Sequence, residues 1–294
     1  MAELLAQLHP TTLLGPFMDD DHVHKVSDMQ IAIYITAFFV FGRLFLDRLI
    51  LEPVGKKLLH NSADVEKFPE NFFKIVSYSL LFIYTYSLAT HAEYYYDTVQ
   101  CWTNIPQPIS LEMKVWYMVQ FSFNAHSFFY ALFFQHKKSD YKVLLVHHIV
   151  TLFLIGGSYM AGYWRIGHLK LLVNDFADIF IAIAKVIGYL SEARKGIWKT
   201  MAPLFYVLMV LAWASTRIFV VAGFVMKSSM LESYEFVPFS HWCFFNALLS
   251  TLFVLYVYWL YLMLKMGYRI LAKGEHKDLR ESEQWKEKNA KKKE

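Results

Sequence analysis

Hydrophobic residues are concentrated in seven long runs that short polar links separate. The runs span approximately residues 29–51, 72–94, 112–135, 141–163, 166–190, 201–226 and 240–271. A helix needs about 20 apolar residues to cross roughly 30 Å of hydrocarbon, and each run is long enough. The runs are continuous and do not alternate with period 2, which favours helices over barrel strands. The pattern predicts an all-α, polytopic membrane protein with about seven transmembrane helices in a bundle that encloses a lipid cavity.

Composition agrees with this interpretation. The chain has 294 residues, of which 56% are hydrophobic, and its mean hydropathy is +0.30. A soluble α-helical domain with a large buried core is the alternative, but this content is too apolar for a domain of this size. The first 28 residues lack a basic segment followed by a short apolar one, so we expect no signal peptide there. The first apolar run is then expected to direct its own insertion.

The charges of the links predict the orientation. The links after the first, third and fifth runs are rich in lysine and arginine, whereas those after the second, fourth and sixth are poor in them. By the positive-inside rule, the amino terminus is extracytosolic and the carboxy terminus is cytosolic. We therefore expect an extracytosolic segment at 1–28, a transmembrane domain at 29–272 and a charged cytosolic tail at 273–294. No clustered basic face with exposed aromatics is evident, so we expect no nucleic acid as a partner.

Four ionisable side chains stand inside two neighbouring apolar runs. His147 and His148 lie in the fourth run, and Asp175 and Asp178 lie in the fifth. An ionised carboxylate at the centre of a membrane helix costs roughly 2.5–3.5 kcal/mol, so such groups normally mark function. The aspartates, three residues apart, share one helix face, whereas adjacent histidines point about 100° apart. The pattern predicts a His/Asp cluster in the cytosolic half of the membrane, with different roles for the two histidines.

Other polar residues of the apolar runs are candidates for the same region. Asn174 and Lys185 lie on or near the face of the aspartates, and Asn124, His126 and Arg217 belong to the third and sixth runs. Two alternatives stay open. The aspartates could form packing salt bridges with Lys185 or Arg217, or a histidine and the aspartates could bind a metal. Metal-binding helices usually repeat their ligands at i and i+4, so we expect no metal.

Cys101 and Cys243 are the two cysteines of the chain. Both are expected on the extracytosolic side, which is oxidising for a protein of the endoplasmic reticulum. A disulfide bond between them and a pair of free thiols at helix ends are both compatible with the sequence.

These motifs resemble those of a known family. The string HHIVT at 147–151, followed by NDFAD at 174–178 and by Lys185, is similar to the signature segment of the TLC-domain ceramide synthases. Further similar segments lie at residues 43–48, 97–102, 213–217 and 277–283. The chain departs from the family pattern at Asn174 and Ala182, where a histidine and a glutamate are usual. The chain keeps the double histidine and both aspartates of the pattern.

The resemblance implies that the chain transfers a fatty acyl group from acyl-CoA to the amine of a sphingoid base, giving a (dihydro)ceramide. It implies His147, His148, Asp175 and Asp178 as catalytic residues. His147 would attack the thioester to form an acyl-imidazole, or act as general base towards the amine. An aspartate on the other ring nitrogen would fix the tautomer. No cofactor is expected, because the thioester is already activated.

Two further sets of side chains are expected to contact substrates. The residues Asn174, Lys185, Arg217, Asn124 and His126 are candidates for substrate binding. The basic third link offers Lys137, Lys138 and Lys142 as partners of the CoA phosphates. The expected partners are acyl-CoA, a long-chain base and membrane lipids, and a homodimer or an accessory subunit stays open.

Two alternatives to this function remain. TLC-domain proteins also include members that resemble lipid sensors or carriers, and a zinc-dependent membrane amidase would run the hydrolytic direction. Lys291 and Lys292 resemble a dilysine retrieval signal, which with the resemblance predicts the endoplasmic reticulum membrane. The link at 227–239 is expected to set acyl length, because the acyl chain would run towards it from His147.

Overall fold

The computed structural model describes residues 28–134, 140–194 and 196–273. The described residues form helices and loops, and no strand occurs among them. The first long helix, α3 (Asp28–Leu46), is continued by η1 (Asp47–Leu51) and α4 (Glu52–Leu58). The next four are α5 (Ser62–Ala89), α7 (Leu111–Phe134), α8 (Tyr141–Met160) and α9 (Trp164–Ala193). The helix α10 (Ile197–Trp213) is continued by η3 (Ala214–Met226) and η4 (Ser228–Glu232), and α11 (Phe239–Lys273) follows. The predicted segment 1–28, except Asp28, and most of the tail 273–294 lie outside the described residues, as do Lys137 and Lys138.

The second apolar run is displaced relative to its helix. The helix α5 begins at Ser62, ten residues before the run at 72–94, because the side chain of Asn61 accepts a hydrogen bond from the amide of Ala63 at 3.2 Å and caps the first turn. The helix ends at Ala89 instead of 94, and residues 93–96 form the separate short helix α6 (Glu93–Tyr96). Both predicted boundaries of this run were wrong. The hydrophobic pattern gives no sign of the Asn61 cap that starts the helix earlier, or of the turn that ends it at Ala89.

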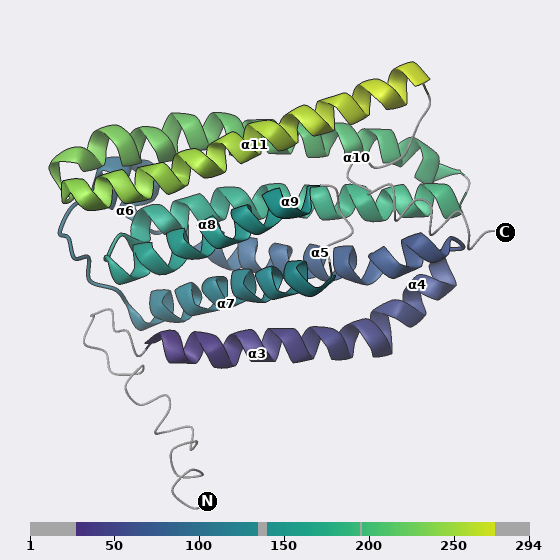
Figure 1. The fold of residues 1–294 in the computed structure, drawn as a ribbon, viewed down its shortest axis with the longest axis horizontal. Helices are drawn as coiled ribbons and strands as arrows, with labels where there is room; N and C mark the ends of the chain where they lie inside the picture. The colour runs from purple at the N-terminus through teal and green to yellow at the C-terminus, as the bar shows by residue number, and fades with distance from the viewer. Residues whose placement is uncertain (1–27, 135–139, 195, 274–294) are drawn as a thin grey trace, which may run out of the picture.

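The long helices pack side by side with their axes roughly parallel (Figure 1). Contacts connect α3 to α7, α7 to α8, α8 to α11, and α11 to η3. The helix α9 contacts α10 and η3 on one side and α5 on the other, and α5 returns to η1 at the end of α3. The helix α8 also contacts α9 directly. The helix α9, which carries both aspartates, is therefore packed against α5, α8, α10 and η3.

The expected all-α membrane fold is confirmed. Among the described residues, five helical stretches are long and apolar enough to cross a membrane, at Asp28–Leu58, Ser62–Ala89, Tyr141–Met160, Ile197–Glu235 and Phe239–Arg269. The long helices α7 and α9 are not among these five, and both carry the polar side chains discussed below. Large apolar side chains such as Phe38, Phe219 and Val254 point outwards. The chain is a multi-pass membrane protein whose polar groups are gathered inside.

A satisfied polar network fixes one end of α9. His168 of α9 is fully buried, and both of its ring nitrogens have partners. Its Nδ1 lies 2.8 Å from the hydroxyl of Tyr94, and its Nε2 lies 3.1 Å from the carbonyl oxygen of Thr85. The indole of Trp116 in α7 donates to the hydroxyl of Thr85 at 2.9 Å. The network connects α5, α6, α7 and α9, and it holds α9 in register beside them.

Candidate functional site

A buried ion pair joins α9 to η3. The Nη2 atom of Arg217 donates to Oδ2 of Asp178 at 2.6 Å, and it also donates to the backbone carbonyl of Asn174 at 3.2 Å. The guanidinium is buried between the rings of Trp213 and Tyr256, whose centroids lie 4.6 and 4.9 Å from it. One of the two ion pairs left open by the sequence is therefore formed. We call Asn174, Asp175, Asp178, Arg217, Tyr256, His147 and Gln120 the Arg217 cluster.

The two aspartates contact different neighbours. Asp175 is 3% exposed, and its Oδ2 accepts a hydrogen bond at 2.7 Å from the side-chain amide of Gln120 in α7. Asp178, less than one turn later, faces η3 instead. Gln120 is fully buried and was not predicted. An intramembrane glutamine four residues before Asn124 was a signal that could have identified it, since buried amides in membrane helices normally bind across helices.

The two histidines also diverge, as their adjacent positions predicted. The ring of His147 faces α11, with centroid distances of 5.2 Å to Trp259 and 6.1 Å to Tyr256. The ring of His148 lies 6.4 Å from Phe128 in α7. The buried Nδ1 of His147 has no hydrogen-bond partner among the described residues. Neither aspartate is hydrogen-bonded to this nitrogen in the structure, since Oδ2 of Asp178 is paired with Arg217 and Oδ2 of Asp175 with Gln120.

Tyr256 connects the histidine to the charged groups. Its ring lies between His147 and Arg217, and its hydroxyl is hydrogen-bonded to the side-chain amide of Asn174 at 3.3 Å. The indole of Trp213 donates to the carbonyl oxygen of Tyr256 at 3.1 Å, which holds α11 against the end of α10. Tyr256 was missed because the last apolar run is rich in aromatic residues, and nothing in its sequence separates an inward ring from a lipid-facing one.

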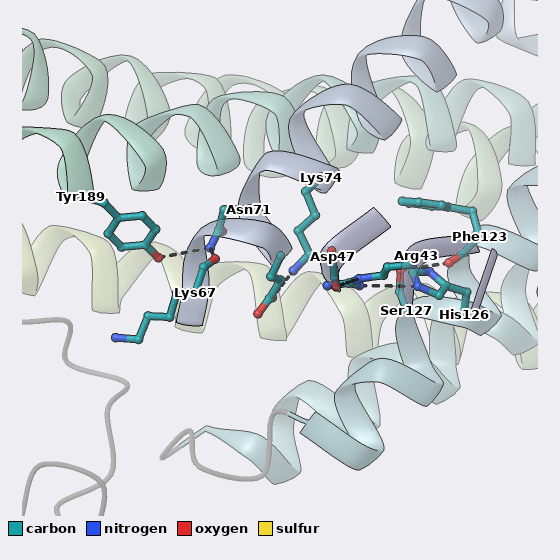
Figure 2. Close-up of polar contacts among 10 residues, drawn as sticks. Arg43, Asp47, Lys67, Asn71, Lys74, Phe123, His126, Ser127 and Tyr189 are labelled. Carbon is teal, nitrogen blue, oxygen red and sulfur yellow. Dashed lines mark hydrogen bonds and ion pairs between the residues drawn. The ribbon is translucent and has the colours of Figure 1, made fainter. Parts of the chain in front are cut away.

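His126 lies in a different cluster, and Figure 2 shows His126 beside Arg43 and Asp47. Its Nε2 is 3.5 Å from Nη1 of Arg43 in α3, and the Nε of Arg43 donates to Oδ2 of Asp47 at 3.3 Å. The guanidinium of Arg43 lies over the ring of Tyr130, 3.4 Å from its centroid, and 5.0 Å from the centroid of Phe73. We call these five residues the Arg43 cluster. The contacts thus place His126 with α3 and α5 and not with the Arg217 cluster.

Figure 2 also shows a polar contact that ties α5 to α9. The side-chain amide of Asn71 donates to the hydroxyl of Tyr189 at 3.1 Å and to the carbonyl oxygen of Lys67 at 2.9 Å. Lys74 is paired with Glu70 at 2.6 Å along α5. The contact between Asn71 and Tyr189 joins α5 to the helix that carries the aspartates, whereas the other two contacts lie within α5.

The remaining predicted contact residues lie at varied distances from the Arg217 cluster. The side chain of Asn124 donates to the carbonyl oxygen of Gln120 at 2.8 Å, one turn along α7. Lys185 is half-buried in α9, seven residues and roughly 10 Å along the axis beyond Asp178. Lys142 is exposed in the first turn of α8. The structure therefore places Asn124 close to the cluster and Lys142 at the surface near the histidines.

The two cysteines are free thiols, so the disulfide bond left open by the sequence is not formed. Cys101 is buried in the core beside Trp102, whereas Cys243 is exposed on α11. Burial raises the pKa of the Cys101 thiol well above its ordinary range, despite the opposing charge of Arg165. Among the described residues, no group of three or more His, Cys, Asp or Glu side chains converges as a metal site.

Comparison with known proteins identifies the family. The model of the TLC domain matches residues 67–265, which include both histidines and both aspartates. The chain belongs to the TLC-domain family. It is 33% identical to ceramide synthase 4 of Bos taurus over 73% of this chain and 54% of that protein. It is 28% identical to ASC1-like protein 3 of Oryza sativa over 79% of this chain and 86% of that protein, and 26% identical to ceramide synthase LOH2 of Arabidopsis thaliana over 84% of this chain and 88% of that protein. The match thus spans about half of the bovine relative and most of the plant ones.

Proposed function

We propose that this protein is a ceramide synthase, which transfers the acyl group of a fatty acyl-CoA to the amine of a sphingoid base. The observation that carries the proposal is the Arg217 cluster, in which His147 lies across Tyr256 from two aspartates and a buried arginine inside a TLC domain. Relatives from cattle and Arabidopsis bear the name ceramide synthase. Groups this costly in a membrane are seldom retained without a function.

The reaction that suits the cluster begins at His147. In the proposed route, an imidazole nitrogen attacks the thioester carbonyl, a C–N bond forms, the C–S bond breaks, and CoA leaves as the thiolate. The amine of the base then attacks the acyl-imidazole, the amide C–N bond forms, and the imidazole is released while the ammonium proton passes to a base. In the alternative route, His147 accepts the amine proton while the amine attacks the thioester directly. Its unpartnered Nδ1 leaves the ring free for either role.

The other members of the cluster balance the buried charges and hold Asp175 and Arg217 in place. Arg217 supplies the counter-charge of Asp178, and Asn174 and the Tyr256 ring hold the guanidinium between them. Asp175 is fixed by Gln120, which leaves its other oxygen for the ammonium group of the sphingoid base. His148 faces away, towards α7, so its proposed part is to orient the helix and to assist His147 from the adjacent position.

The membrane placement follows from the loop charges and is part of the proposal. With the amino terminus lumenal and the carboxy terminus cytosolic in the endoplasmic reticulum, the first turn of α8 meets cytosolic acyl-CoA. Exposed Lys142, with Lys137 and Lys138 beside it in the sequence, would then contact the CoA phosphates. The acyl chain would run from His147 away from the cytosol towards residues 227–239, and the same segment is proposed to limit its length.

Product analysis with purified protein tests the proposal. Palmitoyl-CoA and sphinganine together should give dihydroceramide and free CoA in equal amounts, and omission of sphinganine should abolish the amide product. The variant H147A is the matched control for background acylation, because free amines react slowly with thioesters. Equal product with wild type and H147A, or CoA release with no amide in the presence of sphinganine, would contradict an N-acyltransferase.

A further inference from the structure

An aspartate at the start of α8 does not make the contact expected of its position. Asp140 directly precedes the first turn of α8, where an aspartate side chain normally accepts a hydrogen bond from a free amide of the helix. Its side chain makes no such bond. Asp140 is 5% exposed, and its Oδ2 accepts a hydrogen bond at 2.9 Å from the indole of Trp259 in α11. The carboxylate is therefore committed to another helix instead of its own.

Trp259 stands beside the histidine to which the acyl group is proposed to be transferred. Its ring centroid lies 5.2 Å from that of His147, with an interplanar angle of 79°. It also lies 6.1 Å from the ring of Trp213, which packs on the guanidinium of Arg217. Trp259 is 7% exposed, and a buried indole N–H normally requires an acceptor. Asp140 supplies this acceptor, so its carboxylate fixes a ring that packs directly on His147.

The orientation of the His147 ring depends on such packing. Its Nδ1 has no hydrogen-bond partner among the described residues, so no bond at that atom holds the ring. Three rings contact it, those of Trp259 at 5.2 Å, His148 at 5.5 Å and Tyr256 at 6.1 Å. Trp259 is the nearest of the three. A reacting imidazole nitrogen must be aimed at the carbonyl carbon, and a displacement of about 1 Å can cost roughly 100-fold in rate.

We propose that Asp140 is a positioning residue for acyl transfer, which holds His147 in its reactive orientation through the indole of Trp259. The proposal rests on the proposed function. Asp140 and His147 lie seven residues apart on α8, two turns and roughly 10 Å along the axis, so they share a face that Trp259 covers. Asp140 acts here as a hydrogen-bond acceptor, so its role requires an oxygen atom at this place and not a negative charge.

Steady-state kinetics of the purified full-length protein with palmitoyl-CoA and sphinganine test the proposal. D140L removes the acceptor, and W259F removes the donor while it keeps an aromatic ring. We expect each variant to lower kcat roughly 30- to 100-fold with KM within about threefold of wild type, because the imidazole shifts while the substrate contacts remain. D140N should keep kcat within about threefold, since its amide oxygen still accepts from the indole. The double variant D140L/W259F should lose no more than either single variant, because both remove the same contact.

A matched control separates positioning from general stability. N71L removes a different hydrogen bond between two helices, from Asn71 to Tyr189, and should lower the melting temperature while kcat stays within about threefold of wild type. A loss of kcat in N71L as large as in D140L would overturn the proposal. So would a wild-type kcat in D140L and W259F, an equal loss in D140N, or additive losses in the double variant. Absence of dihydroceramide with wild type would instead contradict the proposed function, which separates that failure from a failure of this proposal.

Discussion

The Arg217 cluster and the Arg43 cluster contain the same kinds of side chain in different arrangements. Each has a buried arginine paired with an aspartate, aromatic rings over the guanidinium and a histidine nearby. In the Arg43 cluster, the ion pair joins neighbouring turns of one continuous helix, with an N–O distance of 3.3 Å. In the Arg217 cluster, it joins α9 to η3 at 2.6 Å. The first pair stabilises one segment, whereas the second also determines how two helices meet.

The two histidines differ more than the two arginines. His126 is 2% exposed, lies beside Arg43, and has the rings of Phe39, Phe73 and Phe123 within about 6 Å of its own. His147 is only half-buried and stands next to a second histidine. The comparison teaches that a set of residue types does not define an active site. What distinguishes the Arg217 cluster is a half-buried imidazole together with two carboxylates on the adjacent helix.

The largest expected effect is on turnover. We expect H147A to lose at least 10³-fold in acyltransferase activity while it inserts and purifies as a folded protein, because the proposed nucleophile or base is removed. H126A should keep activity within about tenfold, since its ring contacts Arg43 and phenylalanines instead of the Arg217 cluster. Steady-state kinetics with palmitoyl-CoA and sphinganine measure both. Comparable losses in the two variants would break the distinction between the clusters.

The next effect concerns stability. We expect D178N to destabilise the protein by about 3–5 kcal/mol, because it leaves the Arg217 guanidinium buried without a counter-charge. D47N should cost only about 1–2 kcal/mol, since the ion pair that it removes is longer, at 3.3 Å instead of 2.6 Å, and joins two turns of one helix. Unfolding in mixed micelles, followed by circular dichroism, measures both free energies of unfolding. A larger loss in D47N would show that the ion pair within one segment is the more important one.

The sequence predicted the general architecture and the central motif better than the contacts. Long apolar runs require helices in a membrane, and the double histidine and paired aspartates stand out because charge is costly there. The partners of these groups could not be predicted, since they come from α7, η3 and α11 and depend on how helices rotate about their axes. Gln120 and Tyr256 were missed for this reason. His126 was grouped with the substrate-binding residues although its contacts are with Arg43 and neighbouring aromatic rings.

A smaller effect is expected at Gln120. The variant Q120L removes the donor to Asp175 and leaves a buried carboxylate oxygen without its partner, at a cost of about 1–3 kcal/mol. We expect roughly tenfold lower activity, with most of the loss in kcat, because Asp175 changes position while both histidines remain. Q120E is a weaker conservative control, since a protonated carboxyl can still donate. Unchanged kinetics in Q120L would show that Gln120 does not position Asp175 for the reaction.

The smallest expected effect is on thiol labelling, which provides a folding control for all these variants. Cys101 lies in the core outside both clusters, and its raised pKa keeps the thiol protonated, because the thiolate appears only as pH rises through the pKa. We expect maleimide at pH 8 to label the exposed Cys243 within minutes and Cys101 only after denaturation, when two thiols per chain should be counted. Rapid native labelling of Cys101 in a variant would show that its loss of activity reflects unfolding.

The central claim is that the Arg217 cluster performs acyl transfer through His147, and intact-protein mass spectrometry tests it most directly. Purified protein is mixed with palmitoyl-CoA alone, quenched and weighed. We expect one palmitoyl adduct in wild type and in H126A, discharge of the adduct when sphinganine is added, and no adduct in H147A. An adduct that persists in H147A, or one that sphinganine does not discharge, would contradict the account.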